Sequence, residues 1–329
     1  FPFADVHLND PGTPVSARIE AWSPFVPGDA DASSRSVAVF HFHVTCTGTA
    51  PVNVQLFALL ENLTGFPETG GCRNTVRHTP AGAGVFLTTA RHEADSPRFG
   101  SMALLCPRSD VHATARAISG PGFDGAWEFW TRLREKGIFP IDAPYAESAE
   151  NETVTAGLTV TASLDPGESV TIPLILAWHS PVSDAGGAPW KTYTGARFED
   201  AWNAAADAAA QRGELENRTR AFQSALFDST VPGIVREAVS SQLSILRSPT
   251  CLRFENGDFW GWEGCSEKQG CCPGSCTHVW NYAQALAYLF PSLERSVREQ
   301  HFDLNMAPSG RMCFRQPLPP GTPCTVETF

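Results

Sequence analysis

Hydrophobic and polar residues alternate along the first half of the chain with the period of β-strands. Four segments show this alternation, or a continuous apolar run, over strand lengths: residues 37–44, 52–57, 158–162 and 170–176. The Asp165-Pro-Gly sequence between the last two is a turn signal of the hairpin type. Strands separated by turns rich in glycine and proline predict an antiparallel β-sandwich over residues 1–185.

A short helix is predicted inside this β region. Asp124 is the expected N-cap, and Trp127, Trp130 and Leu133 recur at helical spacing on one face. The pattern therefore indicates one amphipathic helix that interrupts the strands.

The hydrophobic spacing becomes helical after a loop of glycine, alanine and proline at residues 186–189. Four helices are predicted: residues 198–222, a helix that a cap at Ser229 opens and Pro249 stops, residues 279–290, and a helix that begins at Pro291. On the last of these, Glu294 and Arg298 form a favourable i,i+4 pair. Residues 250–263 are predicted to be extended, and they are rich in aromatic side chains.

These patterns divide the chain into three parts. The β-sandwich domain occupies residues 1–185, a helical linker follows over residues 186–215, and residues 216–329 form a helical domain. At 329 residues the chain is long enough for two domains, because a single core rarely exceeds about 250–300 residues.

Composition and charge exclude several classes of protein. Hydrophobic residues make up 42% of the chain and charged residues 18%, as in ordinary soluble globular proteins. The net charge of −11 argues against a nucleic-acid partner. No apolar run approaches the ~20 residues of a transmembrane helix. The compartment is left open, with the cytoplasm slightly favoured.

Aromatic, amide and carboxylate side chains gather between residues 257 and 291. Glu263 lies between Trp262 and Gly264, and Trp260 precedes it closely. Aromatic faces stack on the apolar face of a pyranose ring, and glycine lets a ligand approach the backbone. Glu263 is therefore a candidate nucleophile for a glycosidic bond, with Trp260 and Trp262 in the sugar site. The alternative is a carboxylate on a surface turn.

His278 and Trp280 lie where a helix is predicted to begin. The N-terminal end of a helix presents free N–H groups and the positive end of its dipole, so both side chains are candidates for lining the sugar site. The alternative places His278 on a helical stripe with Tyr282 and Leu289, which would pack in the core.

A retaining glycosidase also needs a second carboxyl group about 5–5.5 Å from the nucleophile. Asp258 is five residues from Glu263, which is roughly 16 Å along an extended strand and on the opposite face. Glu267 lies in a cysteine-rich loop whose path the sequence does not predict. The chain thus offers a nucleophile and no convincing acid/base.

Five of the ten cysteines lie between Cys251 and Cys276. Cys271, Cys272 and Cys276 together with His278 could hold a zinc ion, but the paired Cys-x-x-Cys arms typical of zinc sites are missing. Disulfides or buried thiols are favoured over a metal. We expect neither a metal nor an organic cofactor.

Two regions resemble glycoside hydrolase family 116, the family of non-lysosomal glucosylceramidase (bile acid β-glucosidase). Ala21-Trp-Ser-Pro-Phe-Val-Pro-Gly-Asp-Ala-Asp, together with residues 37–40, is similar to the family's N-terminal sandwich. Phe259-Trp-Gly-Trp-Glu-Gly through Leu289-Phe-Pro-Ser-Leu-Glu-Arg-Ser is similar to the start of its catalytic domain. The resemblance covers almost the whole chain. It implies an antiparallel β-sandwich followed by the first part of an α/α toroid (six-hairpin barrel).

The same resemblance implies roles for individual residues. Family members are retaining β-glycosidases, and the nucleophile of their aromatic-x-Glu-Gly segment falls on Glu263. A Tyr-Asp pair in the family's sugar subsite falls roughly on Thr277 and His278, and this departure leaves the identity of the sugar open. The family's acid/base aspartate lies beyond the last residue, Phe329.

We therefore expect a retaining β-glucosidase, glucosylceramidase-like, that hydrolyses a β-linked glycoside by double displacement. Its partners are the glycoside substrate and the remainder of the catalytic domain, in the same or a separate chain, which supplies the acid/base. The 329 residues alone are expected to be inactive. One alternative is a β-xylosidase or another β-glycosidase of the family. A second, from a different class, is a non-catalytic carbohydrate-binding or scaffold protein.

Overall fold

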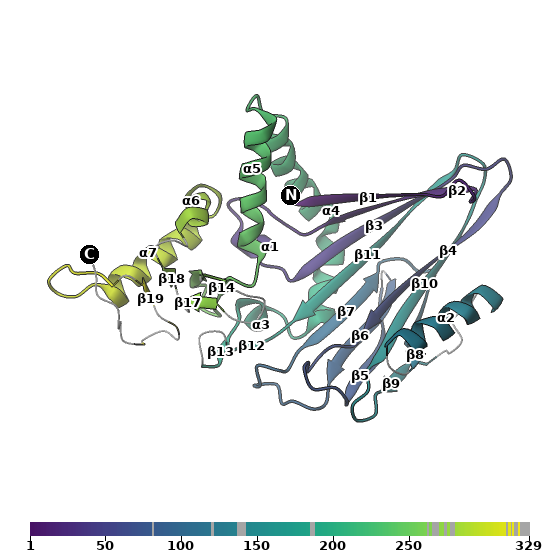
Figure 1. Ribbon diagram of the computed structural model, residues 1–329, viewed down its shortest axis with the longest axis horizontal. Coiled ribbons are helices and arrows are strands. Elements are labelled where there is room, and N and C mark those ends of the chain that lie inside the picture. The colour runs from purple at the N-terminus through teal and green to yellow at the C-terminus, as the bar shows by residue number, and fades with distance from the viewer. Residues whose placement is uncertain are drawn as a thin grey trace.

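The computed structural model shows two stacked β-sheets with helices packed beside them (Figure 1). It describes residues 1–80, 82–119, 122–136, 143–184, 188–261, 263–264, 270–272, 275–276, 280–313, 315–316, 318 and 322. In this part of the chain every helix is too short or too polar to traverse a lipid bilayer.

One sheet is large and antiparallel throughout. Within the described residues it has eight strands, in the order β1-β2-β3-β11-β7-β6-β5-β9. Their bounds are β1 Phe3–Asn9, β2 Val15–Trp22, β3 Val37–Cys46, β5 Cys72–Thr79, β6 Gly82–Thr89, β7 Ser101–Cys106, β9 Tyr145–Glu147 and β11 Ser169–His179.

A smaller antiparallel sheet covers one face of the large one. Its described strands, in order, are β4 Val52–Glu61, β10 Val154–Leu164 and β8 Val111–Ser119. Leu158 of β10 packs against Ile172 and Leu174 of β11 in a core between the sheets. The predicted sandwich is therefore confirmed, and the four predicted strands are β3, β4, β10 and β11.

The turn at Asp165 joins the two sheets, so the prediction of a hairpin between paired strands is wrong. The N–H of Glu168 donates to the carbonyl oxygen of Asp165 (2.9 Å), and Gly167 adopts a positive φ of 81°. Strands β10 and β11 then pair with different neighbours. Both strands carry large apolar side chains on the side that faces the core, so they lie across the core from each other.

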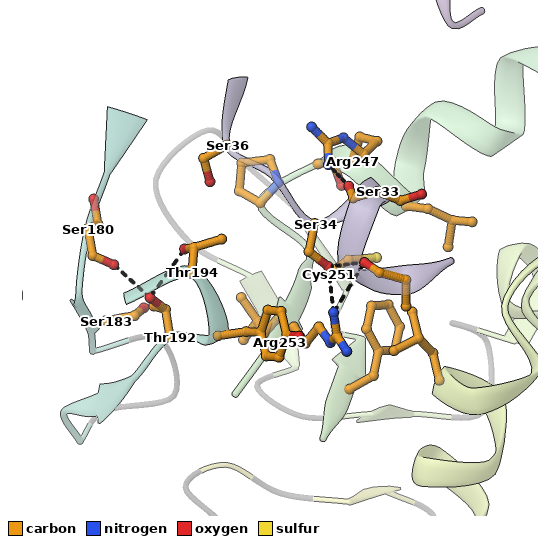
Figure 2. Close-up of a pocket in the computed structure, with 18 of the residues that line it drawn as sticks. Ser33, Ser34, Ser36, Ser180, Ser183, Thr192, Thr194, Arg247, Cys251 and Arg253 are labelled. Atoms are coloured by element: carbon orange, nitrogen blue, oxygen red, sulfur yellow. Dashed lines mark hydrogen bonds between the residues drawn. The ribbon is translucent and has the colours of Figure 1, made fainter. Parts of the chain in front are cut away.

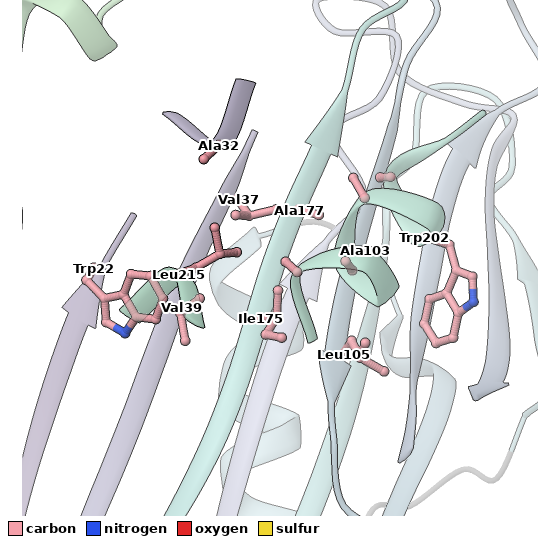
Figure 3. Close-up of a cluster of buried hydrophobic side chains, with 14 of the residues drawn as sticks. Trp22, Ala32, Val37, Val39, Ala103, Leu105, Ile175, Ala177, Trp202 and Leu215 are labelled. Carbon is pink, nitrogen blue, oxygen red and sulfur yellow. The ribbon is translucent and has the colours of Figure 1, made fainter. Parts of the chain in front are cut away.

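A long helix, α4 (Ala201–Phe227), covers the other face of the large sheet. The strands alternate, so Ile175 and Ala177 of β11 point toward α4 while their neighbours face the small sheet. Small residues on α4 let the helix approach closely, and Trp202 and Leu215 fill the remaining space, as Figure 3 shows. This is the helix predicted for residues 198–222, which begins three residues later and extends further.

A second helix, α2 (Gly122–Lys136), lies on the outer face of the small sheet (Figure 1). Phe129 is 8% exposed and packs there with Leu133. Trp127 and Trp130 are 66% and 59% exposed, so the prediction that they share a face with Leu133 is wrong. The helix is rotated so that Phe129 rather than the tryptophans meets the sheet.

Two predicted helix caps also differ from those observed. Asp124 lies inside α2 rather than at its N-cap. Pro232, not Ser229, occupies the N-cap of α5 (Gly233–Leu243), and the Ser229 hydroxyl donates instead to the carbonyl oxygen of Leu226 (2.8 Å).

The helical part follows the predicted order. Its elements are α5 Gly233–Leu243, the 3₁₀ helix η1 Ser244–Arg247, α6 Trp280–Leu289 and α7 Pro291–Asn305. On α7, Glu294 and Arg298 form the predicted ion pair. Two further helices, α1 Ala30–Ser33 and α3 Tyr193–Arg197, lie near the junction with the sandwich. The other described strands form four two-stranded pairs: β12 Val182–Ser183 with β13 Trp190–Lys191, β14 Cys251–Arg253 with β15 Phe259–Gly261, β16 Glu263–Gly264 with β17 Gly270–Cys272, and β18 Ser275–Cys276 with β19 Arg315–Gln316.

Candidate functional site

The segment that leads to Glu263 is a β-hairpin rather than the single extended segment that was predicted. Strand β14 pairs antiparallel with β15, with Cys251 opposite Gly261. The turn closes where the N–H of Phe254 donates to the carbonyl oxygen of Asp258 (2.9 Å). Gly257 takes a positive φ of 94°, a backbone conformation that glycine adopts without strain. The Asn256-Gly257 pair therefore reverses the chain.

Helix α7 clamps strand β15 from the side. The N–H of Phe259 donates to Ser296 Oγ (2.8 Å), and Gln300 Nε2 donates to the carbonyl oxygen of Phe259 (3.3 Å). The N–H of Gly261 donates to Ser275 Oγ (3.1 Å). Since both Gln300 and Ser275 are buried, these bonds are shielded from water. The strand that precedes Glu263 is thus fixed at both of its ends.

The backbone of Glu263 is described, and its side chain is not. In β16 it pairs with Cys272 of β17. Trp280 opens α6, and its side chain likewise lies outside the described part of the chain. Trp262, Thr277 and His278 lie outside the described residues altogether. The roles assigned to all five stay predictions.

Trp260 is the one predicted sugar-site residue whose side chain is described. It is 1% exposed, and its ring stacks on Phe254 with centroids 5.6 Å apart and planes 14° apart. Trp190 packs on Phe254 in turn, at 4.0 Å. The indole Nε1 of Trp260 has no hydrogen-bond partner among the described residues. Trp260 therefore supports the hairpin here, and its contact with a sugar stays a prediction.

A cavity of about 460 Å³ lies between the sandwich and the helical part, beside this hairpin (Figure 2). One wall comes from the sandwich side and carries Ser36, Trp178 and Ser180; the opposite wall comes from η1, β14 and the start of α7. Its size matches the ~300–1,000 Å³ of small-molecule sites. Strand β14 lines the cavity, so cavity and hairpin share a wall.

Arg253 of β14 ties this wall to the N-terminal part of the chain. It donates to Asp31 Oδ1 (2.9 Å) and to Ser34 Oγ (2.9 Å), and its guanidinium lies 3.6 Å from the ring centroid of Tyr193. Burial would raise the pKa of Asp31, but hydrogen bonds from Tyr193 and Arg253 hold it below its ordinary value. Asp31 is thus an ionised carboxylate that pairs with Arg253 through Oδ1 and with Arg197 through Oδ2 (3.1 Å).

The structure gives the oxidation state of five described cysteines. Cys46, Cys72, Cys106 and Cys251 are free thiols, while Cys313 forms a disulfide. Burial raises the pKa of Cys251 to about 12, so this thiol next to the cavity stays protonated and is a poor nucleophile. The side chains of the cysteines in the proposed zinc alternative lie outside the described part of the chain.

Sequence reasoning located the aromatic segment 250–263 but not its hairpin, and it missed the cavity. Its wall is assembled from residues 25–36, 178–194, 246–259 and 290–293, which only the fold brings together. One signal was present in the sequence. Arg247 places a charge directly after the apolar positions of α5. A charge at this place would be expected at an exposed helix end, whereas the structure places it in the cavity wall.

The fold defines the chain as a two-part protein, a β-sandwich with a helix-covered sheet followed by helices that carry a clamped hairpin. Residues 1–218 match the family described as "beta-glucosidase 2, glycosyl-hydrolase family 116 N-term". The chain therefore belongs to glycosyl hydrolase family 116, as the resemblance predicted. Comparison with curated proteins gives no match.

Proposed function

We propose that the chain is part of a retaining β-glucosidase of the glucosylceramidase type, in which Glu263 is the nucleophile. The family match over residues 1–218 supports the enzyme class. The observation that carries the assignment of Glu263 is the clamp on β15, which holds the strand directly before it. A nucleophile needs such a support, because a displacement of about 1 Å can cost about 100-fold in rate.

The proposed reaction is a double displacement. The carboxylate of Glu263 attacks the anomeric carbon as the glycosidic C–O bond breaks, and an acid outside these 329 residues protonates the leaving oxygen. The resulting glycosyl ester is then hydrolysed by water, which the same outside group activates as a base. Trp260, Trp262, Thr277, His278 and Trp280 are proposed to line the sugar site.

The helical part is proposed to be the first part of an α/α toroid, over residues 216–329. Apolar side chains on its helices are uncovered: Ile234 is 79% exposed and Val239 46% on α5, and Tyr288 is 89% exposed on α6. Further helices packed against these faces would remove them from water, at about 25 cal/mol per Å² of apolar surface. This uncovered surface supports a larger helical barrel, with the remainder of the catalytic domain as partner.

The test replaces Glu263 in the complete enzyme. Glu263→Gly should abolish turnover of 2,4-dinitrophenyl β-glucoside, and added azide should restore it. Azide fits the space of the missing carboxylate and attacks from the same face. A C–N bond forms, dinitrophenolate leaves without a proton, and the product is the α-glucosyl azide. Formation of that anomer reports a nucleophile rather than a structural residue.

Glu255 provides the matched control, because it is a half-exposed carboxylate in the turn of the β14–β15 hairpin that precedes Glu263, 3.8 Å from Lys191. Glu255→Gln should keep the activity of the parent enzyme. Full activity in Glu263→Gly, or no azide product from it, would refute the proposed role. Parallel assays with a β-xyloside identify the sugar, and an intact enzyme with no turnover of any glycoside would favour a carbohydrate-binding protein.

A further inference from the structure

The cavity between the sandwich and the helices carries a local positive charge in an acidic chain. Among the described residues that line it, Arg247 and Arg253 are charged and none is a carboxylate. The chain as a whole has a net charge of −11. The two arginines differ in their partners, and that difference indicates what the cavity can bind.

Arg253 already has a carboxylate partner, Asp31, which it shares with Arg197. Arg247 has no carboxylate partner among the described residues. Its Nη1 donates to the carbonyl oxygen of Ser33 and its Nη2 to that of Arg35 (2.9 Å). These bonds fix the guanidinium, but carbonyl dipoles do not cancel a full charge.

Arg247 is also half-buried, so its charge is partly shielded from water. Burial lowers the pKa of Arg247 to about 10, which still leaves it protonated at neutral pH. A guanidinium has five N–H donors, and the two carbonyl oxygens engage two of them. A half-buried guanidinium with no carboxylate partner among the described residues stabilises a complementary oxyanion.

Hydroxyl groups and an aromatic ring complete the lining. Ser36 and Ser180 make no side-chain hydrogen bond to another described residue, so both hydroxyls are free to bind a ligand. The indole of Trp178 is 41% exposed and forms part of the same wall. Phe290 and Leu293 add apolar surface on the opposite side, and Figure 2 shows Ser36 and Ser180 facing Arg247 and Arg253 across the hollow.

We propose that this cavity binds a small organic oxyanion, whose carboxylate or phosphate group pairs with Arg247 and whose apolar body lies against Trp178. The proposal does not depend on the proposed hydrolase mechanism. A carboxylate and a phosphate offer the same paired acceptor oxygens to a guanidinium, so the choice between them is part of the test.

Calorimetric titration of the complete protein tests the proposal with benzoate, phenyl phosphate, inorganic phosphate and uncharged benzyl alcohol as probes. At least one aromatic anion should bind, and benzyl alcohol should bind at least tenfold more weakly. The preferred head group is the one whose aromatic probe binds more tightly. Arg247→Met should weaken that binding at least tenfold, whereas Arg247→Lys should keep part of it. The exposed Arg295 on α7 supplies the control, since Arg295→Met should leave affinity unchanged.

A second variant keeps the test independent of whether Arg247→Met folds. Trp178→Ala removes an exposed ring, so it should fold. It should weaken binding of whichever aromatic anion binds more tightly, and any binding of inorganic phosphate should stay unchanged. No binding by any anion, equal binding of benzyl alcohol, or undiminished binding by Arg247→Met would overturn the proposal. So would a structure of the complete protein in which an acidic side chain from another part of the protein already pairs with Arg247.

Discussion

Trp202 anchors helix α4 to the sandwich, and its replacement by alanine tests whether this helix belongs to the β domain. Trp202 is 8% exposed and lies in the cluster with Ala103 and Leu105 of β7, as Figure 3 shows. It falls within residues 186–215, which the sequence predicts to be a linker. A true linker would lose little when one aromatic ring is removed.

The expected loss follows from the area of the ring. A tryptophan side chain buries about 150–250 Å², which at about 25 cal/mol per Å² gives about 4–6 kcal/mol. The alanines at positions 204, 205 and 208 hold the helix backbone close to the sheet, so the structure has little freedom to fill the void. Measured Trp→Ala changes of about 3–5 kcal/mol set the expected range.

Urea unfolding followed by circular dichroism measures the free energy of unfolding of Trp202→Ala and its parent. Asn203→Ala is the control, because Asn203 is adjacent, exposed and on the same helix. It should change stability by less than about 0.5 kcal/mol. A loss below about 1 kcal/mol for Trp202→Ala would refute the reasoning and return α4 to the role of a linker.

Two further predictions concern the strand clamp and pH. Ser296→Ala removes the acceptor for the N–H of Phe259, so it should lower the free energy of unfolding in urea by about 1–3 kcal/mol. In the complete enzyme it should affect kcat more than KM, whereas Glu299→Gln, at an exposed position on the same helix, is the control. Unchanged kinetics in Ser296→Ala would contradict a positioning role. Burial lowers the pKa of His179. Burial together with the charge of Arg298 lowers the pKa of His301 to about 4. Below about pH 6.5 the unfolded protein therefore binds protons at these histidines that the folded protein does not bind. The free energy of unfolding should therefore be highest above about pH 6.5 and fall as the pH drops toward 4, with His301, which is partly exposed, contributing about 1–2 kcal/mol of the loss. His301→Gln should make the free energy of unfolding depend less steeply on pH. An unchanged pH dependence in this variant would contradict the role of His301.

The sequence predicted the positions of strands and helices better than it predicted which strands pair and which helix face is buried. Residues 170–176 are recognisable as a strand because apolar side chains occupy both of its faces, and the fold buries both, one under α4 and one under the small sheet. Which strand pairs with which depends on contacts between distant residues. For this reason Asp165-Pro-Gly indicated a turn correctly and a hairpin wrongly.

The orientation of α2 illustrates the same limit. Trp127, Phe129, Trp130 and Leu133 are all apolar, so several helix faces could have met the sheet. Only the shape of the small sheet, where Phe57 meets Phe129 with ring centroids 6.4 Å apart, selects one of them. In the candidate site the aromatic segment 250–263 was visible as a local motif, although its reversal into a hairpin was not predicted. The role of Arg247 depends on carbonyl groups more than two hundred residues away.

The sandwich also helps to position the β14–β15 hairpin, which directly precedes the predicted nucleophile Glu263. Phe25 lies three residues after the end of β2 and packs between Phe222 of α4 and Phe290. Its ring centroid is 5.2 Å from that of Phe222 and 5.3 Å from that of Phe290. Phe25 is 1% exposed, and nearby the N–H of Gly28 donates to the carbonyl oxygen of Leu289 (2.6 Å). A contact this apolar and this well bonded behaves as a shared core rather than a flexible joint. Since α7 clamps β15 and the segment after β2 holds the start of α7, the position of β15 is set from the sandwich outward.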